Sequence, residues 1–222
     1  MEKVIIIGGK SSAKLIADHI YDAKVKFNAK YEFLGFAFDE IAVNSEINGF
    51  PVLCNSSEVY QKYEKYKDVK FVFQMYRLDI LLETIKLKDS LKIPNSRYLK
   101  FIHPSCMVAR SAKIGAGTII LANSVVNSNA TIGNFNTIVS NVTIGHDAKI
   151  GNYNLIATQS TIANITMGDR NFIGINCSTN NYISIGDDCM VGMGSNLLKS
   201  IPSGTKCFGN PAKAVDTLKK AL

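Results

Sequence analysis

The sequence predicts two folds in one chain: a small α/β domain with a parallel sheet over residues 1–100 and a parallel β-helix over residues 101–222. In the first half, short apolar runs alternate with helical patterns, which is typical of parallel strands joined by crossover helices. In the second half, an apolar residue recurs at every sixth position, a period that no α-helix has. The change of period near residue 100 therefore marks the expected domain boundary.

The α/β domain begins with Lys3–Ile7, an apolar β-branched run that predicts a buried parallel strand ending in a glycine turn. Ser11 or Ser12 is expected to cap the helix that follows. The other expected elements alternate in type: a helix over Ala13–Tyr21, a strand over Tyr31–Asp39, a turn or short strand over Gly49–Leu53, a helix over Ser56–Tyr66, a strand over Val69–Gln74 and a helix over Leu78–Lys92.

The β-helix is predicted by an unbroken series of Ile and Val at steps of six from Ile102 to Ile162, which slips by one residue and resumes at Met167. Three hexapeptides make one triangular coil of about 18 residues, with the apolar side chain pointing inward. About five such coils fit between residues 102 and 200. A small residue usually lies two positions before the apolar one, and this register includes Cys106, Cys177 and Cys189, which are therefore expected in the core.

Composition excludes several classes of protein. The chain has no apolar run long enough to span a membrane and no visible signal peptide. Its net charge of +7 favours anionic partners such as phosphates or nucleotides, but the lysines are spread along the chain, so nucleic-acid binding is not expected. The five cysteines form no Cys-x-x-Cys pair, which argues against a disulfide framework and favours a cytoplasmic location.

These residues resemble a known family. The six-residue repeat is the signature of left-handed β-helix acyltransferases, and the whole chain resembles bacterial sugar O- and N-acetyltransferases of the NeuD and PglD type. The segments that carry the resemblance are Val4–Gly9, Gly49–Leu53, Ile144–Ile150, Met167–Asn176 and Gly209–Lys213. The resemblance implies an N-terminal Rossmann-like domain for a sugar nucleotide, a left-handed β-helix that uses acetyl-CoA, and a homotrimer with active sites between subunits.

His146 is the candidate general base. It lies two residues after an inward Ile, at an expected corner of the coil, where a side chain projects outward and a substrate can reach it. A neutral imidazole near pH 7 suits proton abstraction. The resemblance puts the catalytic base at this position, and Asp147 would orient the ring or raise its basicity. Of the other two histidines, His19 is expected on a helix surface and His103 in a structural role.

The resemblance also implies where coenzyme A would bind. Pantetheine would lie along the β-helix near Gly174 and Gly192, with Lys213 near the adenine end and a phosphate. In the family, a backbone N–H after the catalytic coil holds the acetyl oxygen. Here that segment is one residue short, so the nearest donor is Ala163 or Asn164. This departure leaves open a catalytically silent β-helix that only binds ligands.

The glycine turn after the first strand matches neither common phosphate-binding motif. A Walker A motif would need glycine at Val4, and a dinucleotide fingerprint would need it at Lys10 and Ala13. What remains is a turn that offers N–H groups at a helix N-terminus, where four residues are candidates for holding a pyrophosphate: Gly8, Lys10, Ser11 and Ser12. Asp39, at the end of the second strand, is the candidate for binding a ribose or base.

The expected function is acetyl-CoA-dependent N-acetylation of a UDP- or dTDP-4-amino-4,6-dideoxy sugar for lipopolysaccharide or another surface glycan. Transfer is expected in a ternary complex, with His146 as base and no cysteine nucleophile. O-acetylation of a sialic-acid-type sugar remains open, because it needs the same base. γ-Class carbonic anhydrases share the β-helix but need three histidine ligands, so no metal is expected. The segment Asp216–Leu222 is expected to form a short helix or tail.

Overall fold

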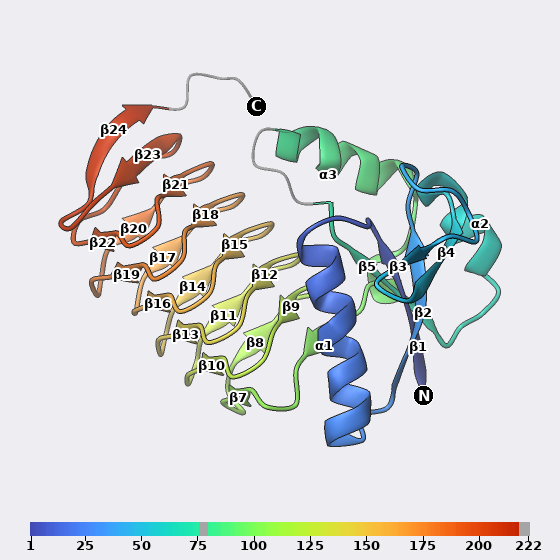
Figure 1. Cartoon of the computed structure of the whole chain (residues 1–222). Helices are drawn as coiled ribbons and strands as arrows, with labels where there is room; N and C mark the ends of the chain where they lie inside the picture. Colours follow the sequence, from blue (N-terminus) through green and yellow to red (C-terminus); the bar gives the residue numbers. More distant parts are fainter. Residues whose placement is uncertain (76–79, 218–222) are drawn as a thin grey trace. The chain divides into compact units, whose positions relative to one another are not determined.

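The computed structural model describes residues 1–75 and 80–217 (Figure 1). The chain divides into two compact units, the first spanning Met1–Leu99 and the second beginning at Lys100. None of the described helices is long and apolar enough to cross a membrane.

The first unit is built on a five-stranded sheet in the order β3-β4-β2-β1-β5, in which only β3 runs antiparallel to its neighbour. Strand β1 is completely buried from Val4 to Ile7. This order places β1 between β2 and β5, so the strand order reverses direction at β1, and in open parallel sheets ligands bind at the carboxyl ends of the strands at such a point. The strands are β1 (Glu2–Ile7), β2 (Tyr31–Ala37), β3 (Glu46–Ile47), β4 (Phe50–Cys54) and β5 (Val69–Phe73).

The helices of this unit differ in length from the prediction. Helix α1 (Ser12–Phe27) continues beyond Tyr21 and ends at Asn28, whose left-handed conformation terminates it. Ser11 occupies its N-cap position but makes no side-chain capping hydrogen bond. The helix expected over 78–92 is α3 (Leu81–Ser90), and Leu78 lies outside the described residues.

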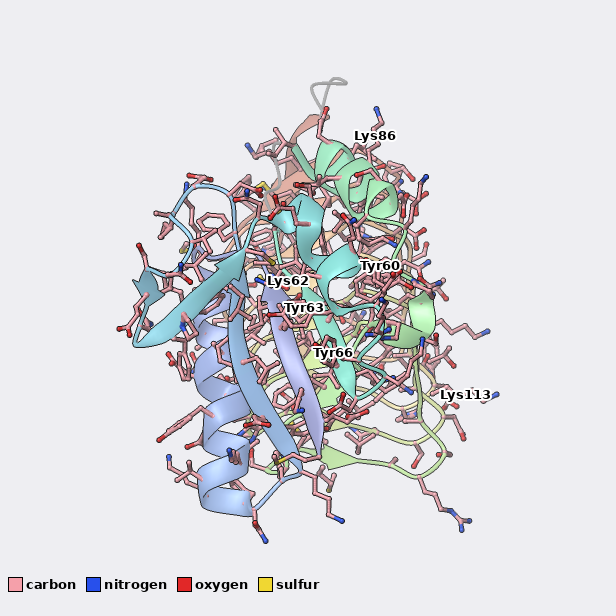
Figure 2. The ribbon with its side chains drawn as sticks, turned by 90° about the vertical axis from the view of Figure 1, so that its right-hand side faces the viewer. Tyr60, Lys62, Tyr63, Tyr66, Lys86 and Lys113 are labelled. Atoms are coloured by element: carbon pink, nitrogen blue, oxygen red, sulfur yellow. The ribbon has the colours of Figure 1, made fainter. Side chains whose placement is uncertain are left out.

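The helix expected over Ser56–Tyr66 is a 3-10 turn, η1 (Ser56–Glu58), followed by the short α2 (Val59–Tyr63). Arg97, in the 3-10 turn η3 (Asn95–Arg97), explains the early end. Its buried guanidinium donates to the carbonyls of Tyr63, Glu64 and Tyr66 at 3.0–3.1 Å. Tyr63 is the last residue of α2, and Glu64 and Tyr66 come directly after it; both tyrosines are labelled in Figure 2. Carbonyls at a helix end need donors, and the guanidinium supplies them in place of a further helical turn.

The second unit is a coil of parallel two-residue strands, in which each strand pairs with the strand three further along the chain. Three sheets result, and they enclose the apolar members of the predicted series from Ile120 to Leu197 as a buried core. The first three members, Ile102, Val108 and Ile114, are only partly buried, as is Thr179. These features fit a left-handed parallel β-helix. The strands are β6 (Phe101–Ile102), β7 (Met107–Val108), β8 (Lys113–Ile114), β9 (Ile119–Ile120), β10 (Val125–Val126), β11 (Thr131–Ile132), β12 (Thr137–Ile138), β13 (Thr143–Ile144), β14 (Lys149–Ile150), β15 (Leu155–Ile156), β16 (Thr161–Ile162), β17 (Thr166–Met167), β18 (Phe172–Ile173), β19 (Ser178–Thr179), β20 (Ser184–Ile185), β21 (Met190–Val191) and β22 (Asn196–Leu197).

The slip in the sequence period is a short corner between β16 and β17. Paired residues are 18 apart before it, as in Thr143 with Thr161, and 17 apart across it, as in Lys149 with Thr166. The spacing then returns to 18, as in Phe172 with Met190. The one-residue deletion is therefore absorbed in a single coil, and the coils on either side keep their register.

The C-terminal expectation was wrong for the residues that the structure describes. Asp216 and Thr217 belong to strand β24 (Lys213–Thr217), which runs antiparallel to β23 (Thr205–Phe208), and the rest of the expected helix or tail lies outside the described residues. β23 in turn pairs with β21 of the last coil. The physical reason is that β23 would otherwise leave one edge unpaired, and β24 satisfies its backbone groups.

The corners of the coils use residues in the left-handed conformation, and one of these corners is sterically crowded. Phe135 and Tyr153 occupy equivalent corners with stacked rings, 5.2 Å apart and 9° from parallel. Gly117 lies at the same corner one coil earlier with φ 68°, and a Cβ there would come within 2.5 Å of the Phe135 ring. A side chain at Gly117 is thus excluded twice, by backbone conformation and by a ring that its neighbour holds in place.

We expect Gly117→Ala to destabilise the protein more than Gly194→Ala. Gly194 has the same φ of 68° but open space around it, so its substitution costs only the left-handed strain, about 1 kcal/mol. Gly117→Ala adds overpacking against Phe135, roughly 1–3 kcal/mol more. Urea unfolding of both variants measures the difference. Equal losses would mean that the aromatic stack moves aside without cost.

Candidate active site

His146 and Asp147 occupy an exposed corner of the β-helix between β13 and β14. Asp147 has a left-handed backbone conformation with φ 59°, which Asp tolerates better than most residues, and its N–H donates to the carbonyl of Ser128 at 2.9 Å, one coil earlier. The two side chains are 64% and 50% exposed. The corner therefore presents both groups to solvent, where a substrate can reach them.

The imidazole and the carboxylate are in direct contact, with His146 Nδ1 2.7 Å from Asp147 Oδ2. A carboxylate only accepts, so Nδ1 carries the proton and Nε2 of the neutral ring keeps a lone pair. Asn129 donates from Nδ2 to the other oxygen, Oδ1, at 3.2 Å. These hydrogen bonds, first from His146 and then from Asn129, hold the pKa of Asp147 below its usual value. The carboxylate is thus ionised at neutral pH and favours the tautomer that a general base needs.

The segment Ala163–Asn164 lies against this corner in the next coil, since a Cβ at Gly145 would come within 2.8 Å of the Ala163 carbonyl carbon. The N–H of Ala163 donates to Thr179 Oγ1 at 2.9 Å, and the N–H of Asn164 donates to Asn181 Oδ1 at 3.2 Å. Both residues named as oxyanion donors are therefore beside the His146 corner, and each donor has a side-chain acceptor from the following coil.

Thr179 shows how the chain accommodates the short corner. It occupies an inward position that carries Ile, Val, Leu or Met elsewhere in the series. In the preceding coil, the Gly145 N–H donates to the backbone carbonyl of Ile162 at 2.6 Å. The equivalent N–H of Ala163 donates instead to the Thr179 hydroxyl. A side-chain oxygen thus replaces a ladder carbonyl where the deletion shifts the backbone.

The glycines predicted for coenzyme A stack in consecutive coils. A Cβ at Gly174 would come within 2.5 Å of the Met193 nitrogen, and one at Gly192 would overlap the Phe208 ring. Lys213 pairs with Phe208 across β23 and β24. The three predicted residues Gly174, Gly192 and Lys213 are therefore linked through neighbouring coils and β24, in a series that we call the run from Gly174 to Lys213.

An apolar strip, defined as Ile175, Met193 and Phe208, borders this run. These side chains are 48%, 75% and 37% exposed. Lys206 Nζ lies 5.7 Å from the centre of the Phe208 ring. The strip and Lys206 were not predicted from the sequence, although large apolar residues at outward positions of the repeat were a usable signal.

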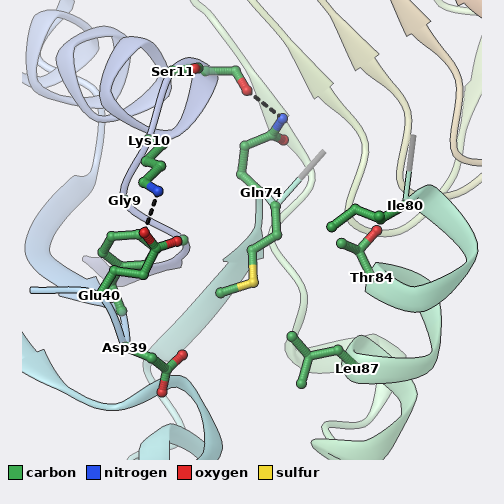
Figure 3. A pocket seen from close by; sticks show the side chains of 13 residues that line it. Gly9, Lys10, Ser11, Asp39, Glu40, Gln74, Ile80, Thr84 and Leu87 are labelled. Atoms are coloured by element: carbon green, nitrogen blue, oxygen red, sulfur yellow. Dashed lines mark hydrogen bonds and ion pairs between the residues drawn. The ribbon is translucent and has the colours of Figure 1, made fainter. Parts of the chain in front are cut away.

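In the first unit, the carboxyl ends of β1, β2 and β5 surround a cavity of about 510 Å³ (Figure 3). All five residues predicted to bind a nucleotide line it: Gly8, Lys10, Ser11, Ser12 and Asp39. Eight further lining residues were not predicted, and four of them have large apolar side chains. They are Gly9, Phe38, Glu40, Gln74, Met75, Ile80, Thr84 and Leu87. The apolar ones come from loop and helix positions whose role depends on the tertiary fold.

The polar groups of this cavity are engaged with one another. Lys10 forms an ion pair with Glu40, and Gln74 donates to Ser12 Oγ at 2.8 Å. Asp39 accepts from the backbone N–H of Ser56 at 3.1 Å and from its hydroxyl. Asp39 therefore holds the start of η1 as well as lining the cavity. Glu40 therefore competes with any anionic ligand for the Lys10 ammonium.

Two further kinds of site were considered from the sequence: a metal site that includes His103 and a cysteine nucleophile. His103 is buried, with Nδ1 2.8 Å from Ser105 Oγ, and within the described residues no group of side chains is suited to hold a metal ion. The five cysteines are free, and burial raises the pKa of each thiol, that of Cys207 to about 11. Thiols of this kind are poor nucleophiles at neutral pH.

Solved structures share this fold over nearly the whole chain. WeeI from Acinetobacter baumannii matches with a TM-score of 0.79 at 22% identity, covering 97% of this chain and 100% of that one. PerB from Caulobacter crescentus, solved with CoA and GDP-perosamine, matches at 0.69 and 20%, covering 97% and 98%. The acetyltransferase domain of PglB from Neisseria gonorrhoeae, solved with acetyl coenzyme A, matches at 0.68 and 22%, covering 96% and 99%. No protein-family model and no curated protein matches the chain. A perosamine N-acetyltransferase from Caulobacter crescentus also matches, at 0.71 and 21% identity. The predicted resemblance to sugar acetyltransferases is therefore confirmed at the level of the fold.

We expect Thr179→Val to destabilise the short coil by about 1 kcal/mol, because the Ala163 N–H loses its acceptor while the side-chain volume is kept. Hydrogen exchange of the Ala163 amide should become faster. Thr161→Val, an exposed position in the strand paired with β19, is the control and should change stability by less than about 0.5 kcal/mol. Unchanged protection of the Ala163 amide would mean that the ladder carbonyl takes over.

Proposed function

We propose that this protein is an acetyl-CoA-dependent N-acetyltransferase of a nucleotide-linked amino sugar. The observation that carries the proposal is the exposed His146–Asp147 pair, with Nδ1 and Oδ2 2.7 Å apart, at a corner of the β-helix. The fold it shares with sugar acetyltransferases over nearly the whole chain supports the same reaction class.

In the proposed reaction, the amine nitrogen of the sugar attacks the thioester carbonyl while Nε2 of His146 takes a proton from it. A carbon–nitrogen bond forms and the carbon–sulfur bond breaks, with its electron pair leaving on the sulfur of coenzyme A. The imidazolium then returns its proton to the thiolate, so the protein ends unchanged. The ionised Asp147 stabilises the imidazolium through the Nδ1 hydrogen bond.

The acetyl oxygen needs a donor while it carries negative charge. Of the two candidates, the Asn164 N–H is the better placed, because its acceptor is the exposed side chain of Asn181, which an oxyanion can displace. The Ala163 N–H is held by Thr179, a residue of the core register. Asn164 is therefore the proposed oxyanion donor.

Coenzyme A is proposed to lie along the run from Gly174 to Lys213. The apolar strip offers a surface for pantetheine, and the Phe208 ring with Lys206 and Lys213 offers an aromatic face and positive charge for adenine and phosphate. The sugar nucleotide is proposed to bind the first unit as a Rossmann-like domain, with its diphosphate at Gly8, Lys10, Ser11 and Ser12 and its nucleoside near Asp39.

The finer identity of the substrate is part of the same proposal. A UDP- or dTDP-linked 4-amino sugar remains the expected acceptor, and the GDP-perosamine bound to PerB adds GDP-linked sugars to the set to be tested. O-acetylation of a sialic-acid-type sugar is the alternative. We further propose a cytoplasmic homotrimer with active sites between subunits, serving the synthesis of a surface glycan.

We expect His146→Ala to lower thiol release from acetyl-CoA by at least about 100-fold, because the acceptor loses its general base. The assay uses UDP-, dTDP- and GDP-linked amino sugars and free sialic acid as acceptors. His19→Gln, on α1 of the first unit, is the control and should keep full activity. Coenzyme A binding without thiol release from any acceptor would contradict the proposed reaction and favour a silent binding protein.

We expect Lys10→Ala and Glu40→Gln to change nucleotide affinity in opposite directions. Loss of the ammonium should weaken UDP, dTDP or GDP binding by about 5- to 10-fold, and release of Lys10 from Glu40 should strengthen it by about 2- to 5-fold. Calorimetry measures both. Lys24→Ala, in the last turn of α1, is the matched control for charge. Weaker binding in both variants would argue against a phosphate role for Lys10.

A further inference from the structure

Asp147 has a second partner besides His146. Its Oδ2 faces the imidazole, and its Oδ1 accepts a hydrogen bond from Asn129 Nδ2 at 3.2 Å. Asn129 comes from the preceding coil, 18 residues earlier in the chain. A carboxylate held at both oxygens cannot rotate freely about its side-chain bonds, so its orientation toward the imidazole is set from two sides.

Asn129 is itself held in place. Its backbone is in the left-handed conformation with φ 59°, and its N–H donates to Ser111 Oγ at 3.0 Å, one coil further back. The backbone of Asp147 returns to the same corner, because its N–H donates to the carbonyl of Ser128. Three consecutive coils thus support the side chain that faces His146.

Asn129 could serve the backbone alone, because asparagine adopts the left-handed conformation more readily than most residues. Asn123 provides the comparison. It also has φ 59°, and its N–H donates to Ser105 Oγ at 2.9 Å. The two asparagines therefore have the same backbone conformation and the same backbone hydrogen bond, and Asn129 differs in its side-chain contact with Asp147.

We propose that Asn129 is a positioning residue for the His146–Asp147 pair: its side-chain amide fixes the Asp147 carboxylate so that the imidazole keeps its proton on Nδ1 and its lone pair on Nε2. This inference rests on the proposed function only for its effect on turnover. The effect on the tautomer of His146 can be measured without a substrate. Ser111 holds the backbone of Asn129, and the side-chain contacts run from Asn129 through Asp147 to His146.

The test is a long-range proton–nitrogen NMR spectrum of the histidine side chains at pH 8, together with steady-state kinetics. The chain has three histidines, and His146 is assigned by its absence in His146→Ala. The variants are Asn129→Gly, which keeps the left-handed backbone, and Asn129→Asp, which keeps the side-chain size but cannot donate. Asn123→Gly is the matched control.

In the wild type, we expect the His146 signals to show the tautomer protonated at Nδ1. In both Asn129 variants the spectrum should shift toward a mixture of tautomers, and kcat should fall about 3- to 10-fold with little change in either KM. The pKa of Asp147, followed by its carboxyl carbon, should rise toward its usual value in Asn129→Gly because one stabilising donor is gone. Asn123→Gly should match the wild type in the His146 tautomer, in kcat and in the pKa of Asp147.

An unchanged His146 tautomer in both Asn129 variants would overturn the proposal and leave Asn129 as a turn residue. An equal effect from Asn123→Gly would also overturn it, because the change would then follow from the backbone. If no acceptor is turned over by the wild type, the proposed function fails, and the tautomer measurement still decides the role of Asn129.

Discussion

The hydrogen-bond register between successive coils is the constraint on which the second unit depends. Each strand of the coil has only two residues, so it gains its order from the strands before and after it, 18 residues away along the chain, and from the apolar side chain that it buries. Corners then recur at fixed places. Because the Gly145 backbone packs against Ala163, the corner that carries His146 has a defined neighbour in the next coil.

The one irregularity of this register lies beside the candidate catalytic corner. The deletion after Ile162 shortens a corner by one residue, and Thr179 supplies a hydroxyl where a backbone carbonyl would otherwise accept. A core position is thus used for hydrogen bonding rather than for apolar contact. The consequence for chemistry is local: the Ala163 N–H is held by the core, while the Asn164 N–H faces an exposed acceptor that a ligand can replace.

In the first unit, the candidate site is formed by loops at one edge of a parallel sheet. A parallel sheet brings the loops after β1, β2 and β5 to one edge, so residues far apart in the sequence line a single cavity. There the electrostatics oppose simple anion binding, because Lys10 is paired with Glu40 and Asp39 adds a second carboxylate. In the proposed nucleotide complex, the phosphates would share or take Lys10 from Glu40, so this ion pair would lower the affinity for an anionic ligand.

The sequence by itself determined what depends on a local pattern: the six-residue period, its slip before Met167, the glycine turn after β1 and the outward corner at His146. Only the tertiary structure decided what depends on neighbours in other coils or strands. Helix α2 ends at Tyr63 because Arg97 donates to the carbonyls of Tyr63, Glu64 and Tyr66. Strand β24 pairs with β23 where a helix or tail was expected. The tertiary structure likewise supplied the contacts that surround the candidate sites: Asn129 on Asp147, Thr179 on Ala163, Phe208 over Gly192, Glu40 on Lys10 and Ser56 on Asp39. These partners lie 16 or more residues apart in the chain, and no local preference encodes which side chains will meet at that separation.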